Sequence, residues 1–182
     1  AAALATWQIL ATDRLENALT SDRGDGPTDN VVLISVGVVS ALLIAGLIAG
    51  LFYREFTKAH DFSDSTFTQL AVVHTHLLTL GFVVLLTVLL LEKVFTLSSS
   101  KMFGWFFWTY NAGVVLTAAM MVWHGSLTVV GREGSPMISG IAGMGHMLLT
   151  VALVLLMLSL GRAITHQDLP ATAKSDEAAL RP

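Results

Sequence analysis

Four long runs of apolar side chains divide most of this 182-residue chain. An α-helix needs about 20 mostly apolar residues to cross the hydrocarbon core of a bilayer. The runs cover residues 31–53, 67–91, 102–130 and 137–161. Short connections join them, and short connections place neighbouring helices antiparallel. The sequence therefore predicts an all-α integral membrane four-helix bundle as one domain, residues 31–164.

The composition supports this class and excludes several kinds of site. Hydrophobic residues make up 54% of the chain and charged residues 13%, against about 25% charged in ordinary soluble domains. The net charge of -3 gives no indication of nucleic-acid binding. The chain has no cysteine, which excludes disulfides, thiolate zinc sites, cysteine-ligated iron–sulfur clusters and covalent c-type haem. Any metal or haem must therefore be held non-covalently.

The two flanks of the predicted domain have a different character. Residues 1–30 carry leucines and a tryptophan at roughly helical spacing, with charges between them. They are typical of an amphipathic segment on the membrane surface, followed by a linker over 21–30. A processed leader is the alternative interpretation. Residues 165–182 are expected to form a flexible tail.

The basic residues predict the orientation of the chain, because cytoplasmic loops are enriched in Lys and Arg. Three of them fall on one side of the predicted spans: Arg54, Lys58 and Arg132. Seven fall on the side of both termini: Arg14, Arg23, Lys93, Lys101, Arg162, Lys174 and Arg181. We therefore expect a multi-pass membrane protein with both termini in the cytoplasm.

Four histidines fall inside the predicted spans, and they are the candidate cofactor-binding residues. Ionisable side chains inside a bilayer are costly and mark functional sites, and imidazole is a common ligand of metals and haem iron. His76 and His146 each lie nine residues from the same membrane boundary, a depth of roughly 13 Å in a helix. His74 and His124 lie in the same half. The sequence predicts that these four residues gather at one depth.

The spacing of His74 and His76 limits what they can bind together. Residues i and i+2 of a helix lie about 200° apart around its axis, so the two rings cannot chelate one ion. Each must find a different partner, or one binds metal while the other only hydrogen-bonds. The alternative is that an intramembrane histidine serves as a hydrogen-bonded packing residue between helices.

Further side chains near the histidines are also candidates. Arg54 and Arg132 lie at the predicted outer ends of the spans, where cations pair well with haem propionates; interfacial anchoring is the alternative. The methionines beside the histidines are predicted to be packing residues rather than iron or copper ligands: Met120, Met121, Met144 and Met147.

Five stretches of the chain carry a specific resemblance over about residues 31–164. They are LFYREFTK, VVHTHLLTLGF, LLLEKVF, WFFWTYNAG and ISGIAGMGHMLL. These stretches resemble a bacterial family of small four-helix membrane proteins that has no assigned function. The resemblance implies a four-helix membrane fold in the bacterial cytoplasmic membrane, but it says little about mechanism.

A more distant resemblance is to one four-helix quartet of the catalytic subunit of haem–copper oxidases and nitric oxide reductases. That subunit has an H-x-H pair on the second helix of a quartet, and His74 and His76 occupy such a position here. The resemblance implies a homotrimer like the twelve-helix core, with His74 of one protomer and His76 of its neighbour clamping one haem b. It is an analogy of fold. The chain lacks the H-P-E-V-Y copper motif and an adjacent histidine pair on the third helix, so a complete oxygen- or nitric-oxide-reducing centre is not expected.

These observations leave three functional hypotheses open. The leading one is a b-type haem protein with bis-histidine ligation, for electron transfer or haem-based redox sensing, related to oxidoreductases and partnered by quinol or a respiratory redox protein. The second is a copper or zinc binding or transport protein that uses His74, His76, His124 and His146. The third is a non-catalytic assembly partner of a respiratory complex.

Overall fold

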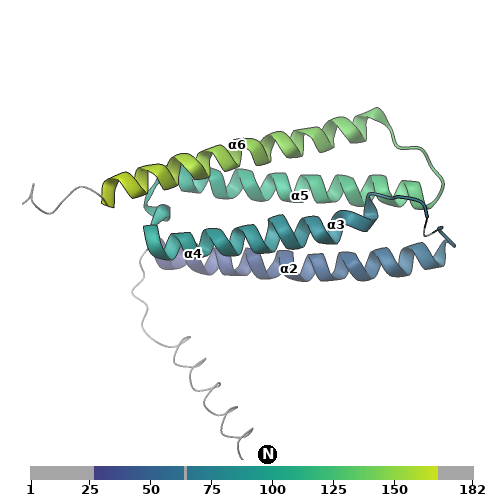
Figure 1. Cartoon of the computed structure of the whole chain (residues 1–182), viewed down its shortest axis with the longest axis horizontal. Coiled ribbons are helices and arrows are strands. Elements are labelled where there is room, and N and C mark those ends of the chain that lie inside the picture. The colour runs from purple at the N-terminus through teal and green to yellow at the C-terminus, as the bar shows by residue number, and fades with distance from the viewer. Residues whose placement is uncertain (1–26, 64, 168–182) are drawn as a thin grey trace, which may run out of the picture.

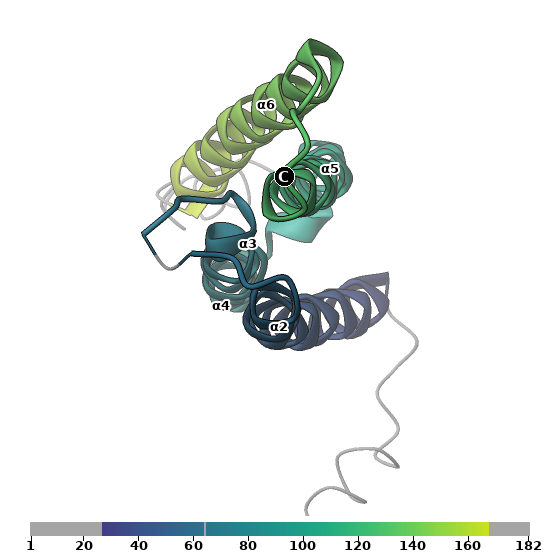
Figure 2. The same cartoon turned by 90° about the vertical axis from the view of Figure 1, so that its right-hand side faces the viewer.

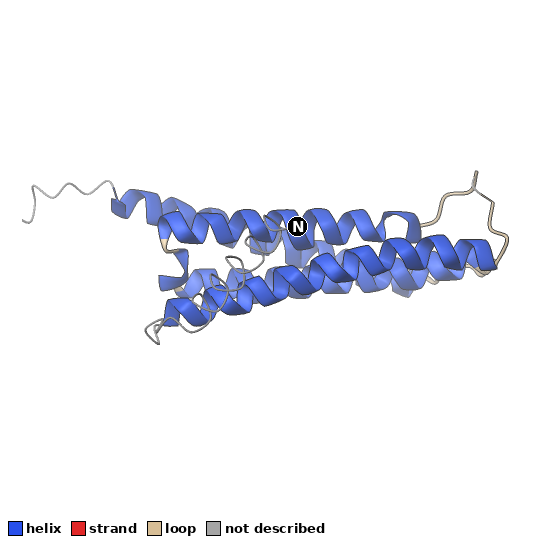
Figure 3. Cartoon of the chain, turned by 90° about the horizontal axis from the view of Figure 1, so that it is seen from below, coloured by secondary structure: helices blue, strands red, loops and turns tan. Residues whose placement is uncertain are grey.

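The computed structural model describes residues 27–63 and 65–167. The predicted amphipathic segment over 1–26 and the predicted tail over 168–182 lie outside the described residues. Within the described part of the chain, the regular elements are helices (Figure 3).

Four of the helical stretches are long and apolar enough to cross a membrane, as predicted. The second is composite, made of α3 (Leu70–His76), the π-helical η1 (Leu77–Val84) and α4 (Leu85–Phe95). The other three are α2 (Pro27–Ala59), α5 (Lys101–Val129) and α6 (Pro136–Gln167) (Figure 1). These features indicate a multi-pass membrane protein.

Two boundaries differ from the sequence expectation. Residues 27–30 were predicted as linker but form the first turn of α2, where Pro27 is well placed because its fixed φ suits a helix start. Residues 165–167 were predicted as tail but continue α6. In both places a helix continues past its apolar run into polar sequence, where hydropathy gives no signal.

The helices pack in chain order (Figure 2). The first, α2, packs on the composite span, the composite span packs on α5, and α5 packs along α6. Between 22% and 39% of the most apolar stretch of each span is buried. Lipid tails are as apolar as the side chains that face them, so such exposure costs nothing in a bilayer. The most deeply buried side chains lie between the composite span and α5: Leu70, Val73, Phe106, Tyr110 and Val114.

The start of α3 is fixed against α5 by a close backbone crossing. The Thr68 hydroxyl, 1% exposed, donates a hydrogen bond of 2.9 Å to the carbonyl of Gly125. A Cβ added at Gly125 would overlap the backbone nitrogen of Leu70 and lie 2.8 Å from its Cα. Only glycine allows this approach, which holds the first turn of α3 against the residue that follows His124.

The π-helical η1 begins directly after His76. Hydrogen bonds from i to i+5 widen such a segment, which is uncommon and often lies at functional sites. The Tyr110 hydroxyl of α5 donates to the carbonyl of Leu80 inside it, at 3.0 Å. On the other side, a Cβ at Gly81 would lie 3.0 Å from the Leu42 side chain of α2. The widened segment is therefore fixed from both sides.

A tight turn joins α4 to α5. Thr96 adopts a left-handed conformation with φ of 47° and leads into the short 3₁₀ helix η2 (Leu97–Ser99). Glu92, 4% exposed, accepts hydrogen bonds from the backbone N–H of Ser98 at 2.8 Å and from its hydroxyl at 2.5 Å. The Ser100 side chain then caps α5 by accepting from the N–H of Met102. A buried carboxylate therefore organises this turn, a role that the apolar run ending at residue 91 did not indicate.

Candidate functional site

His76, which is half-buried, and His146, which is exposed, face each other between α3 and α6. Their ring centroids lie 6.2 Å apart and the ring planes make an angle of 69°. His76 is the last residue of α3, and His146 lies on α6, 70 positions later in the sequence. The fold thus brings together two histidines that the sequence places at the same membrane depth.

The hydrogen bonds of this pair leave ring nitrogens available for a ligand. His146 Nδ1 lies 3.0 Å from the carbonyl oxygen of Ala142. A carbonyl can only accept, so Nδ1 carries the proton and Nε2 keeps its lone pair. His76 Nε2 is buried and, among the described residues, has no hydrogen-bond partner. A buried unpaired polar group costs about 1–3 kcal/mol, so a bound metal ion or polar ligand would be stabilising here.

His124 shares a cavity of about 240 Å³ with His146. The cavity is bounded by Gln69 before α3, by Met120 and His124 of α5, and by Ser139 and His146 of α6. His124 packs against Gly134, where a Cβ would overlap its ring, and its Nδ1 is buried without a partner among the described residues. His146 is therefore the link between the other two: its ring faces His76, and it lines one cavity with His124.

His74 points to the other side of the composite span. A Cβ at Gly50 of α2 would lie 3.7 Å from His74 Cβ, so the histidine packs on α2. Its Nδ1 is buried and lacks a partner within the described residues. The two histidines of the His-Thr-His sequence thus face opposite neighbours, α2 and α6, as the helical spacing predicts.

The site offers a bare metal ion too few ligands. Within residues 27–63 and 65–167, no group of three or more His, Asp or Glu side chains is arranged to hold a metal ion. Structural zinc sites are almost always four-coordinate, and catalytic sites keep three protein ligands. The close contact here consists of two imidazoles.

The two candidate arginines lie at the ends of spans. Arg54 Nη1 pairs with Glu55 Oε1 at 2.8 Å, and both side chains are more than 60% exposed. Exposed pairs of this kind contribute little to stability, so Arg54 is free to exchange partners. Arg132 is exposed in the connection between α5 and α6.

Two further hydroxyls are buried on α5 and α6. The sequence predicts that Thr117 hydrogen-bonds across helices, and it does not single out Ser159. Thr117 Oγ1 and Ser159 Oγ are buried and unpartnered among the described residues. A Cβ at Gly145 would overlap the Thr117 hydroxyl, so α5 and α6 approach closely one residue before His146. A threonine or serine in an apolar run gives no signal of this kind, because most bond to their own helix.

Comparison with known proteins adds a family but no activity. No curated protein and no solved structure matches the chain. One family profile matches residues 35–163, more than two thirds of the sequence, and its description is "Protein of unknown function (DUF2871)". The matched range contains the four candidate histidines and Arg54 and Arg132. The chain therefore belongs to the DUF2871 family of proteins of unknown function.

Proposed function

We propose that this protein binds haem b non-covalently, with His76 and His146 as the axial ligands. The observation that carries the proposal is the facing pair of imidazoles, one with a free Nε2 lone pair and one with a buried, unpartnered Nε2. A porphyrin supplies four ligands to its iron, so two histidines complete the set. A bare zinc or copper ion would need one or two more protein ligands.

The surroundings of the pair fit a haem ligand. The Ala142 carbonyl orients His146 through Nδ1–H, and a hydrogen bond of this type fixes the tautomer and raises the basicity of the other nitrogen. We assign Arg54 and Arg132 to the haem propionates, since both are exposed cations at the ends of the spans.

The ligand set also indicates the chemistry. Two histidines leave no open position on the iron, so a bound haem would supply a one-electron redox centre rather than a gas-binding site. We therefore propose electron transfer or haem-based redox sensing in a protein related to haem–copper oxidases, with quinol or a respiratory redox protein as its partner. His76 and His146 would hold the iron, and the packed helices would keep the two rings in place.

A visible absorption spectrum tests this function. We expect protein purified in detergent from haem-supplied cells to give a sharp low-spin spectrum that changes on reduction. Extraction should recover about one haem per chain, because one opposed pair is present. A colourless protein would contradict the proposal, and stoichiometric copper or zinc without porphyrin in elemental analysis would favour the metal-binding alternative.

We further propose that three copies assemble as a homotrimer in the bacterial cytoplasmic membrane, with both termini in the cytoplasm. Two observations support the trimer. The helices α2 and α6 lie at opposite ends of the packing order (Figure 2), and only 22% of the most apolar stretch of each is buried. Each could therefore pair with a neighbouring copy. The excess of Lys and Arg on the side of the termini supports the orientation.

The oligomeric state gives a direct prediction. We expect the protein part of the purified complex to have about three times the mass of the 19.5-kDa chain. Light scattering with detergent subtraction measures this mass. A protein that stays monomeric at high concentration and in several detergents would rule out the trimer but leave the haem site untouched, because His76 and His146 belong to one chain.

A further inference from the structure

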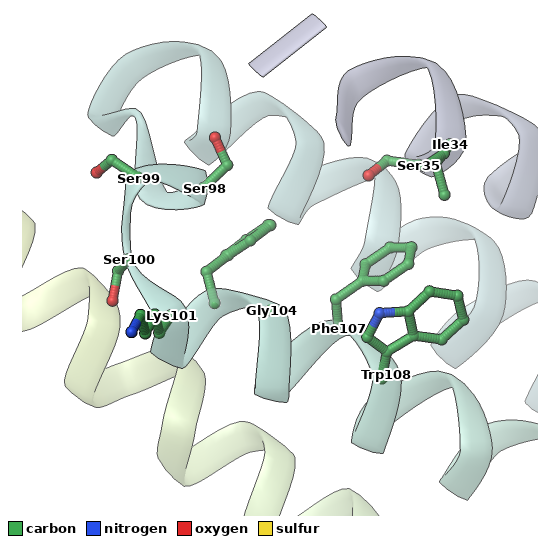
Figure 4. Close-up of a pocket in the computed structure, with 10 residues that line it drawn as sticks. Ile34, Ser35, Ser98, Ser99, Ser100, Lys101, Gly104, Phe107 and Trp108 are labelled. Carbon is green, nitrogen blue, oxygen red and sulfur yellow. The ribbon is translucent and has the colours of Figure 1, made fainter. Parts of the chain in front are cut away.

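A second cavity, of about 370 Å³, lies at the end of the spans opposite the histidines. It is formed between the turn from α4 to α5 and the last turns of α6. Its polar walls come from Ser99 and Ser100 on the turn and from Ser159 and Arg162 on α6. Figure 4 shows a separate pocket at the same turn, which Ser99 and Ser100 also line, together with Phe107 and Trp108.

The buried polar group of this cavity is Ser159. Its side chain is 2% exposed, and its hydroxyl has no hydrogen-bond partner among the described residues. The hydroxyl of a serine in a helix commonly donates to a backbone carbonyl of the same helix. The Ser159 hydroxyl makes no such bond, so it remains available to a ligand. Its position in the cavity wall, one turn before Arg162, places a hydroxyl and a guanidinium on the same helix face.

The turn adds the positive end of a long helix. Ser100 is the N-cap of the 29-residue α5, and the partial charges of the first backbone N–H groups favour an anion there. The Ser100 side-chain oxygen accepts from the N–H of Met102, which leaves the hydroxyl hydrogen free to donate. The hydroxyl of Ser99 donates to the carbonyl of Thr96, and its oxygen can still accept a hydrogen bond.

Arg162 supplies the formal positive charge. One of its terminal nitrogens donates to the thioether sulfur of Met102 at 2.7 Å, and thioether sulfur is a weak acceptor. The remaining N–H donors of the guanidinium are open to a stronger acceptor. The nearest acidic group in the turn, Glu92, does not line the cavity, and both of its oxygens bond to Ser98. The cavity is therefore built for an anion.

We propose that this cavity binds the phosphate of an anionic phospholipid. It lies at the end of the membrane spans, at the level where lipid headgroups are found. Arg162 also lines an adjoining hollow with Met157 and Leu158, whose side chains are 56% and 52% exposed. An acyl chain attached to the bound phosphate can lie along this apolar flank of α6. Free inorganic phosphate would gain only the polar contacts.

Native mass spectrometry of the delipidated full chain tests the proposal, with added phosphatidylglycerol and phosphatidylcholine as probes. We expect the protein to retain phosphatidylglycerol in preference to phosphatidylcholine. Arg162→Ala should lower phosphatidylglycerol binding by about tenfold or more, as expected for loss of a hydrogen-bonded charge. Arg162→Lys should restore part of it, and Ser159→Ala should lower it by a few fold.

Lys93→Ala is the matched control, because Lys93 is an exposed cation at the same end of the molecule that does not line the cavity. It should bind phosphatidylglycerol like the original protein. Equal retention of the two lipids, or equal losses in Arg162→Ala and Lys93→Ala, would overturn the site. Inorganic phosphate that displaces phosphatidylglycerol at equal concentration would show that the cavity recognises free phosphate and would overturn the lipid assignment.

Discussion

Replacing His76 by alanine should abolish the low-spin haem spectrum, and His146→Ala should do the same. Each substitution removes one of the two proposed axial ligands, and among the described residues the ring contact at this site joins these two histidines alone. Removing a residue that only hydrogen-bonds to a metal ligand lowers metal affinity by about 10–100-fold. Removing an axial ligand itself should therefore lower haem affinity by more. The measurement is the haem content and visible spectrum of each purified variant.

Two other histidines provide controls for this experiment. His60 is exposed, bonds to the carbonyl of Phe56 and stacks on its ring at 4.4 Å, so His60→Ala should leave the spectrum unchanged. His74→Ala should retain the haem held by His76 and His146, because His74 packs on α2. A spectrum that vanishes in His74→Ala and survives in His146→Ala would show instead that the haem is shared between protomers.

The second large effect is on stability. Gly125→Ala should destabilise the protein by about 3 kcal/mol, the upper part of the range for overpacked sites. The added methyl group would overlap the backbone of Leu70, and a backbone cannot rotate away as a side chain can. For a chain of this size we expect a fall of roughly 6–12 °C in the unfolding midpoint. Tryptophan fluorescence of the detergent-solubilised protein follows the transition.

Gly140→Ala is the matched comparison for Gly125→Ala. Nothing lies within 4 Å of a Cβ at Gly140, and alanine is favoured over glycine in a helix by about 1 kcal/mol. We therefore expect an unchanged or slightly raised midpoint. If both variants shift the midpoint equally, the close crossing of α3 and α5 does not control stability.

The four spans and the opposite directions of His74 and His76 follow from sequence alone. Both rest on local rules: the length of an apolar run and the 3.6-residue period of a helix. Hydropathy also gives the depth of each histidine along its helix. It does not give the rotation of one helix against another, so the facing of His76 and His146 within one chain needed the structure.

The glycines illustrate the same limit. Gly140, Gly143 and Gly145 lie within six residues of α6 and are indistinguishable in sequence. In the structure only Gly145 lies against α5, where it meets Thr117, while Gly140 and Gly143 have open space beside them. The burial of Glu92 is another case, because its partner Ser98 lies beyond a left-handed turn at Thr96 that no apolar pattern indicates.

The π-helical η1 separates the second span into two α-helical parts and sets the rotation of one part relative to the other. Each residue of an α-helix advances about 100° around the axis, and the wider turns of η1 advance less per residue. The direction of His76 relative to Glu92, 16 positions later in the sequence, therefore differs from the one that a continuous α-helix would give. Because Tyr110 and Leu42 hold η1 from both sides, this difference in rotation is a fixed property of the fold.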